Sequence, residues 1–161
     1  MKRIDFIVIH CSADPADTTK DASDIERYHR SLGWRHVGYH YLINRDGTEV
    51  AGRPEDMRGA HEKSVNSRSI GVCMIGGAPP LGSKEYRLGL GEDNFTPEQW
   101  ITLGNTIARL HRKYPDAEIV GHRDLGAKKA CPSFDVKPWW EAVQEYIRTH
   151  GGLPTLDPFR L

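Results

Sequence analysis

Hydrophobic and polar positions follow two different periods along this chain, and together they predict strands alternating with helices. Short β-branched apolar runs such as IDFIVIH and SIGVCMI are typical of strands buried in a sheet. A helical spacing instead separates the apolar residues Trp100, Leu103, Ile107 and Leu110. The predicted strands cover residues 4–10, 39–44, 48–51, 69–75 and 117–121, and the predicted helices cover 23–32, 97–114 and 137–148.

Local signals at the ends of these segments support the prediction. Ser23 and Glu26 have the spacing of a capping box that opens the first helix, and Gly33 ends it. The TPEQ segment at 96–99 combines an N-cap, a proline at the first helical position and a closing Gln. Asp46-Gly47 predicts a hairpin turn between two of the strands.

Two segments lack either period. Residues 78–94 are rich in Gly and Pro and are expected to form a long surface loop, and residues 151–161 are expected to form a C-terminal tail. The remaining elements predict one α/β domain over residues 1–150, with a central mixed sheet of about five strands flanked by helices. Polar groups at the strand ends of such a sheet commonly form the ligand site.

Charge and cysteine content narrow the classes of protein that fit. The 161 residues hold 22 Lys and Arg against 22 Asp and Glu, a balance that argues against nucleic-acid binding by bulk attraction and against a polybasic membrane binder. Three cysteines cannot form a complete set of internal disulfides. The opening segment MKRID carries charge where a secretory signal needs apolar residues, so we expect synthesis in the cytosol.

Histidines that end two of the predicted strands are candidate metal ligands. His10 and His122 occupy these positions, and Cys131 follows nine residues after the second. Zinc binds His nitrogen and Cys thiolate, and its catalytic sites combine three protein ligands with one open position. Because eight His and three Cys allow many such triples, spacing alone leaves surface histidines and buried cysteines as an open alternative.

Five segments of the chain carry a resemblance to a known family. In order they are IVIHCSA, GWRHVGYHYLINRDGT, GAHEKSVNSRSIGVCMIGG, NFTPEQ and GHRDLGAKKACPSFD. The chain resembles the zinc-dependent N-acetylmuramoyl-L-alanine amidases, whose fold is shared with peptidoglycan recognition proteins, over roughly residues 4–140. The resemblance implies one zinc ion, peptidoglycan as partner, and hydrolysis of the amide between N-acetylmuramic acid and L-alanine. It also implies a phage endolysin that acts in host cell lysis.

The resemblance implies a role for particular residues. It makes His10, His122 and Cys131 the zinc ligands, and it makes Tyr39 and Lys129 the catalytic residues, as in a phage member of the family. Zinc lowers the pKa of a bound water toward roughly 7, and a nearby cation such as Lys129 can stabilise the oxyanion. No carboxylate stands out as general base, so we expect the zinc-activated water and Tyr39 to share that task.

Three further residues are candidates for substrate contact. His61 belongs to a block that lines the family's cleft, although a plain surface role is an equal alternative. Trp34 could stack on sugar or peptide or pack in the core, and Asn66 could contact stem-peptide carboxylates or lie on the surface. Cys11 and Cys73 are expected to be small buried core residues.

Two other functions stay open beside the amidase. A domain of the same fold could bind peptidoglycan without cleaving it, although Cys131, whose loss marks that state, is present. A phage member of the family also inhibits an RNA polymerase, which makes such a partner a second possibility here. We expect a monomer that binds neither nucleic acid nor membrane. It would be made in the host cytoplasm and would meet the periplasmic wall after release.

Overall fold

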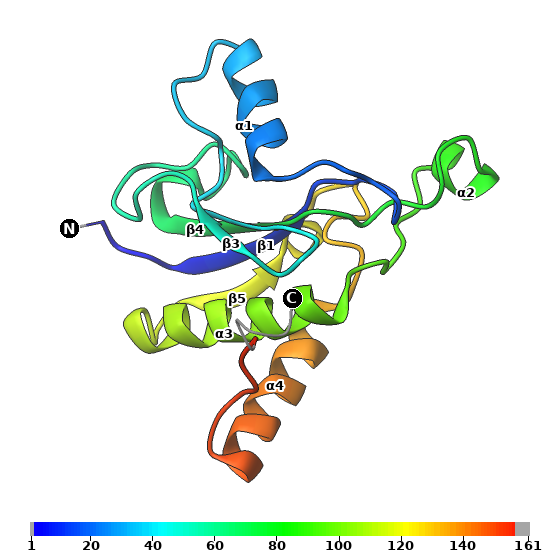
Figure 1. Cartoon of the computed structure of the whole chain (residues 1–161). Helices are drawn as coiled ribbons and strands as arrows, with labels where there is room; N and C mark the ends of the chain where they lie inside the picture. The colour runs from blue at the N-terminus through cyan, green and yellow to red at the C-terminus, as the bar shows by residue number, and fades with distance from the viewer. Residues whose placement is uncertain (1, 157–161) are drawn as a thin grey trace.

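A mixed sheet with five strands forms the centre of the molecule (Figure 1). The computed structural model describes residues 2–156. The strand order is β3-β2-β4-β1-β5, and only β3 runs antiparallel to its neighbour. The strands are β1 (Phe6–Cys11), β2 (Tyr41–Ile43), β3 (Glu49–Ala51), β4 (Ser69–Met74) and β5 (Glu118–Gly121). The five predicted strands are therefore confirmed, with ends that differ by up to two residues.

Strand β1 lies between β4 and β5 and is parallel to both. Its residue Ile7 is in register with Ile70 on one side and Ile119 on the other. A strand with parallel neighbours on both sides is covered on both faces, which explains its nearly continuous apolar sequence. The parallel arrangement also brings the carboxyl ends of β1, β4 and β5 to the same edge of the sheet.

Helices α3 (Pro97–Lys113) and α4 (Val136–His150) lie on one side of the sheet, and α1 (Ala22–Ser31) projects from the other side (Figure 1). On one face, Ile7 and Ile9 of β1 pack with Leu103 and Ile107 of α3 and with Trp140 of α4. On the opposite face only the first turn of α1 packs against the sheet, and Val65 of the irregular segment that precedes β4 packs against Val8 and Val120. The helices are α1 (Ala22–Ser31), α2 (Lys84–Arg87), α3 (Pro97–Lys113) and α4 (Val136–His150), with 3-10 turns η1 (Asn66–Arg68) and η2 (His122–Leu125).

The first helix begins at a different cap from the one predicted. Asp21 is the N-cap of α1, because its carboxylate accepts hydrogen bonds from the backbone N–H groups of Ser23 and Asp24. Asp24 closes the box by accepting from the Asp21 N–H, so the predicted box of Ser23 and Glu26 is wrong. A carboxylate two positions earlier has the same capping ability and adds its charge to the helix N-terminus. The box at Thr96 and Gln99, by contrast, is confirmed.

The 78–94 segment is less irregular than predicted. It contains the short helix α2, and both of its ends are fastened to the sheet. Ala78 is buried, while the Asn94 side chain accepts from Gly77 N and donates to the carbonyls of Asp14 and Ala78. Residues 80–93 between these ends are almost all exposed, with Leu81 69% exposed, so the predicted surface loop is confirmed.

The segment after α4 turns back onto the domain. Leu153 packs against the core, and the Asn105 side chain donates a 2.8 Å hydrogen bond to the Pro154 carbonyl. The last residues of the expected tail, 157–161, lie outside the described residues. Among the helices that the structure describes, none is both long and apolar enough to cross a membrane.

Candidate metal centre and active site

Three potential metal ligands converge at the edge where β1 and β5 end. His10 lies in β1, His122 directly follows β5, and Cys131 lies in the loop leading to α4. Their ligand atoms all lie within 4.8 Å of one another. The convergence follows from topology, because parallel pairing of β1 with β5 places the ends of two distant segments together. Spacing alone left many triples open, and among the described residues the fold brings this one together.

The donor set fits a zinc ion. Zinc–nitrogen bonds of about 2.05 Å and zinc–sulfur bonds of about 2.3 Å at tetrahedral angles separate the two donor atoms by about 3.6 Å. The distance between Cys131 Sγ and His10 Nδ1 is 3.8 Å. Two imidazoles and one thiol also match the three-ligand pattern of catalytic zinc sites.

Protonation of the ligands is consistent with cation binding. Burial lowers the pKa of His10 well below its ordinary value, and the neighbouring charges of His61, His122 and Lys129 act in the same direction. His10 is therefore neutral at pH 7, as a metal ligand must be. The side-chain hydrogen bond with Cys11 and burial raise the pKa of the Cys131 thiol. A metal ion would displace the thiol proton when it binds.

A second layer of side chains contacts both histidines. His61 Nδ1 lies 2.9 Å from His10 Nε2, and Glu62 Oε2 lies 2.7 Å from His122 Nε2. Burial, followed by the charges of neighbouring cations, lowers the pKa of His61 to about 3, so this imidazole is neutral. Sequence reasoning did not single out Glu62. Its position beside His61 in GAHEK was the only available signal, because His122 is 60 residues away.

The two residues expected to be catalytic lie beside this cluster. The ring of Tyr39 is centred 5.2 Å from the ring of His10. Burial raises the pKa of Tyr39 well above its ordinary value, with smaller contributions from Cys73 and Cys131, so the phenol keeps its proton at neutral pH. Lys129 is exposed in the loop between His122 and Cys131, and its charge is close enough to lower the pKa of His10.

Comparison with known proteins places this arrangement in a family. The profile of the family described as N-acetylmuramoyl-L-alanine amidase matches residues 1–134, a span that holds all three ligands. This chain belongs to the N-acetylmuramoyl-L-alanine amidase family. As a member, it is an amidase that acts on peptidoglycan.

Relatives of this amidase include phage proteins. The endolysin of Klebsiella phage KP32 is 42% identical over 145 residues, which cover 90% of this chain and 91% of the relative. The endolysin of Escherichia phage T7 is 42% identical over 137 residues, or 85% of each chain. Among solved structures, the N-acetylmuramoyl-L-alanine amidase LysC from Clostridium intestinale superposes with a TM-score of 0.68 at 26% identity, covering 91% of this chain and 87% of that one. The expected fold is confirmed.

Other residues singled out in the sequence lie around the amidase site with distinct contacts. Trp34 is 37% exposed, and its ring centre lies 4.7 Å from that of His29. Asn66 is buried, and its side-chain oxygen accepts hydrogen bonds from the backbone N–H groups of the two residues that contact the ligands. Cys11 and Cys73 are buried, as expected. Substrate contact by Trp34, His61 and Asn66 stays a prediction.

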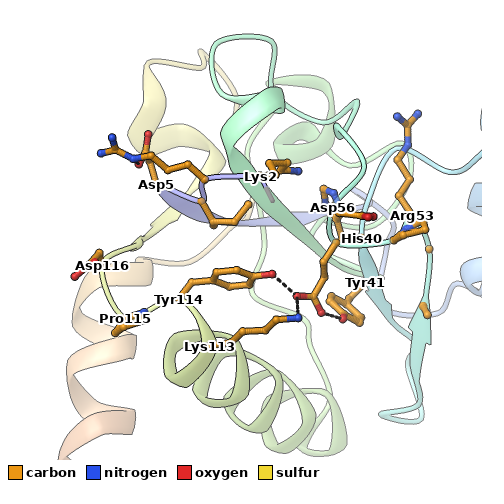
Figure 2. A pocket seen from close by; sticks show the side chains of 16 residues that line it. Lys2, Asp5, His40, Tyr41, Arg53, Asp56, Lys113, Tyr114, Pro115 and Asp116 are labelled. Carbon is orange, nitrogen blue, oxygen red and sulfur yellow. Dashed lines mark hydrogen bonds and ion pairs between the residues drawn. The ribbon is translucent and has the colours of Figure 1, made fainter.

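A cavity of about 950 Å³ lies away from the amidase centre (Figure 2). It is lined by residues that precede β1 and β5, and therefore lies at the edge opposite the metal ligands. Glu55 in its wall accepts hydrogen bonds from Lys113 Nζ at 2.9 Å, from the Tyr114 hydroxyl at 2.7 Å and from the Tyr41 hydroxyl. Lys2 donates to the Met57 carbonyl. Glu55, Lys113, Tyr114 and Tyr41 thus form an ion-pair cluster in the wall of this cavity.

Proposed function

We propose that this amidase is a zinc-dependent endolysin that hydrolyses the bond between N-acetylmuramic acid and the L-alanine of the stem peptide. The observation that carries the proposal is the convergence of His10, His122 and Cys131. Family membership supports the bond cleaved, and the phage endolysins among the relatives support a role in host lysis. We assign this activity to residues 1–150 and expect one zinc ion per chain.

Zinc would be held by the two imidazoles and the thiolate, the three-ligand set that catalytic zinc sites combine with one further position. When bound, it would supply Lewis acidity toward the scissile carbonyl and lower the pKa of water. The remaining task is to stabilise the charge that develops on the carbonyl oxygen. Preorganised donors at such a position are each worth about 3–4 kcal/mol.

Tyr39 and Lys129 would provide those donors. The raised pKa of Tyr39 keeps its hydroxyl protonated, so it can donate a hydrogen bond to the oxyanion or orient the attacking water. Lys129 is tethered two residues from Cys131, and its ammonium can approach the oxyanion from the solvent side because the side chain is exposed. We also propose that Trp34, which is partly exposed, contacts the incoming sugar or peptide.

Peptidoglycan is the partner implied by this reaction. We propose that the protein is made in the host cytoplasm and meets the periplasmic wall once the membrane has been permeabilised. The balance of 22 basic against 22 acidic residues makes bulk attraction to an anionic wall weak, which leaves recognition to the cleft around the ligands.

The test is mass spectrometry of purified peptidoglycan digested by the protein. We expect free stem peptides that begin with L-alanine, lost when a chelator is added and restored by zinc. A Cys131→Ser variant should release none, while Glu141→Ala, on the exposed side of α4, should match the wild type. Release of intact sugar fragments would contradict the proposed bond. A protein that retains zinc but releases no peptide would instead be a binding module.

A further inference from the structure

We propose that the adjacent residues His61 and Glu62 are positioning residues for the two histidine ligands, with His61 orienting His10 and Glu62 orienting His122. The inference rests on the zinc site of the proposed function. It concerns the side of each imidazole that faces away from the ion. A ligand histidine has two nitrogens, and a hydrogen bond to the outer one selects the tautomer and fixes the ring.

Glu62 fixes His122 through a short hydrogen bond between two largely buried side chains. Their 2.7 Å contact occupies His122 Nε2 and leaves Nδ1 as the nitrogen available to the ion. The side chains are 14% exposed for His122 and 16% for Glu62, so solvent competes little for the bond. The other carboxylate oxygen of Glu62 accepts hydrogen bonds from the backbone N–H and the hydroxyl of Ser64, which holds the carboxylate in place.

His61 fixes His10 by a chain of hydrogen bonds. His10 Nδ1 faces Cys131, while its Nε2 contacts His61 Nδ1 at 2.9 Å, and His61 Nε2 contacts Ser69 Oγ at 3.1 Å. If Nδ1 of His10 binds the ion, Nε2 carries the proton and donates to His61. His61 must then carry its own proton on Nε2 and donate to Ser69. The geometry thus selects one tautomer for each ring.

The backbone at two glycines comes close to the ring of His61. A Cβ added at Gly71 would come within 2.6 Å of its Cδ2 atom. A Cβ added at Gly59 would come within 2.5 Å of the same atom. Any side chain at either position would displace the imidazole and its hydrogen bond to His10. Close approach of backbone to ring therefore accounts for both glycines.

One side chain holds the two positioning residues together. The Asn66 oxygen accepts hydrogen bonds from the N–H groups of His61 and Glu62, each at 2.8 Å. Asn66 is 7% exposed and forms the start of η1, directly before β4. A single turn fastened to the sheet therefore sets both imidazoles. The two ligands receive unequal partners, because His122 faces a carboxylate and His10 faces a neutral imidazole.

Substitution of Glu62, the carboxylate that contacts His122, gives the most direct test of the positioning role. Zinc affinity of the full chain is measured by competition with a chromophoric chelator, and the visible spectrum of the cobalt-substituted protein reports the ligand set. We expect Glu62→Ala to weaken zinc binding by about 10- to 100-fold. Glu62→Gln keeps an acceptor oxygen without the charge, so it should lose less zinc affinity than Glu62→Ala. Glu141→Ala removes a carboxylate from the exposed side of α4 and should bind zinc as the wild type does.

The same measurements test the other positioning contacts. Asn66→Asp retains an acceptor oxygen and should restore the affinity that Asn66→Ala loses, and His61→Asn should restore part of the loss in His61→Ala. Circular dichroism establishes that each compared variant is folded.

The outcomes separate the inference from the function on which it rests. If the wild type binds no zinc, the proposed function fails. If the wild type binds zinc tightly and Glu62→Ala and His61→Ala bind it equally tightly with an unchanged cobalt spectrum, the positioning role is overturned while the zinc site stands. A tenfold or greater loss in the alanine variants, reduced in the conservative ones, supports the role.

Discussion

The ion-pair cluster around Glu55 offers a quantitative test of how strongly strands β2 and β3 are held to the end of α3. Glu55 follows β3, and its carboxylate accepts hydrogen bonds from Lys113 and Tyr114 at the end of α3 and from Tyr41 at the start of β2 (Figure 2). Replacing Glu55 by Gln keeps the shape of the side chain and removes its charge. The substitution therefore measures how much the charge of Glu55 contributes to the free energy of unfolding.

The size of the effect follows from the protonation of the carboxyl group. Burial alone would raise its pKa, but the hydrogen bonds from Tyr41, Tyr114 and Lys113 outweigh burial and lower the pKa of Glu55 from an ordinary 4.5 to about 2. That difference corresponds to at most about 3 kcal/mol of stabilisation. Because the Lys113 side chain is 59% exposed, solvent screening reduces the figure, and we expect Glu55→Gln to cost about 1–2 kcal/mol at pH 7.

The dependence on pH has a definite sign. The folded-state pKa of Glu55 lies below the unfolded value, so the stabilisation is complete above pH 4.5 and is lost as the pH falls toward 2. Urea denaturation of the wild type and Glu55→Gln, followed by circular dichroism at steps from pH 7 to pH 2.5, measures the difference in unfolding free energy. Effects common to both proteins, such as loss of a metal ion in acid, cancel in this difference.

A surface carboxylate gives the matched control. Glu145 pairs with Arg148 one turn further along α4 and is 60% exposed, so Glu145→Gln should cost less than about 0.5 kcal/mol at any pH. The reasoning would be refuted if Glu55→Gln cost as little as the control at pH 7. It would also be refuted if the cost of Glu55→Gln were the same at pH 2.5 as at pH 7.

Further expectations concern the core and the metal centre. Ile107→Ala should lower the unfolding free energy by about 2–5 kcal/mol in urea denaturation, because this side chain is fully buried under the sheet, and a loss below 1 kcal/mol would contradict that packing. Zinc at 100 times its Kd should stabilise the fold by about 2.7 kcal/mol, and a Tm indifferent to zinc and chelator would argue against a resident ion. Zinc affinity should rise with pH, since the ion must displace the proton from the Cys131 thiol, whose pKa is raised, and a pH-independent Kd would count against thiolate ligation. Tyr39→Phe should slow peptide release by about 10²–10³-fold at unchanged zinc content, and full turnover would remove Tyr39 from the mechanism.

The strands were predictable because their signals are local, whereas the choice of His10, His122 and Cys131 among many possible triples depended on the resemblance to a known family. An apolar run followed directly by His10 or His122 indicates both a strand and the edge at which it ends. The cap of α1 was misplaced because Asp21 and Ser23 are both good N-caps, and sequence alone does not decide between neighbours. The choice depends on how the preceding loop enters the helix.

Contacts between distant segments were beyond the reach of pattern reasoning. Glu62 meets His122 across 60 residues, and Glu55 meets Tyr114 across 59. In the sequence each of these acidic residues looks like an ordinary solvated charge. The surface alternative for Asn66 is wrong, because the residue is buried and its oxygen accepts hydrogen bonds from two backbone N–H groups. Which polar groups become buried is settled by the packing of the whole domain.

The ligands of the metal centre lie far apart in the order of synthesis. His10 is translated 121 positions before Cys131. A chain that has not been extended to Cys131 therefore lacks the third candidate ligand, even when the first strands have formed. Zinc uptake would be a late event that coincides with docking of β5 and the following loop. Under the proposed zinc mechanism, a product that stops before Cys131 would therefore release no stem peptides.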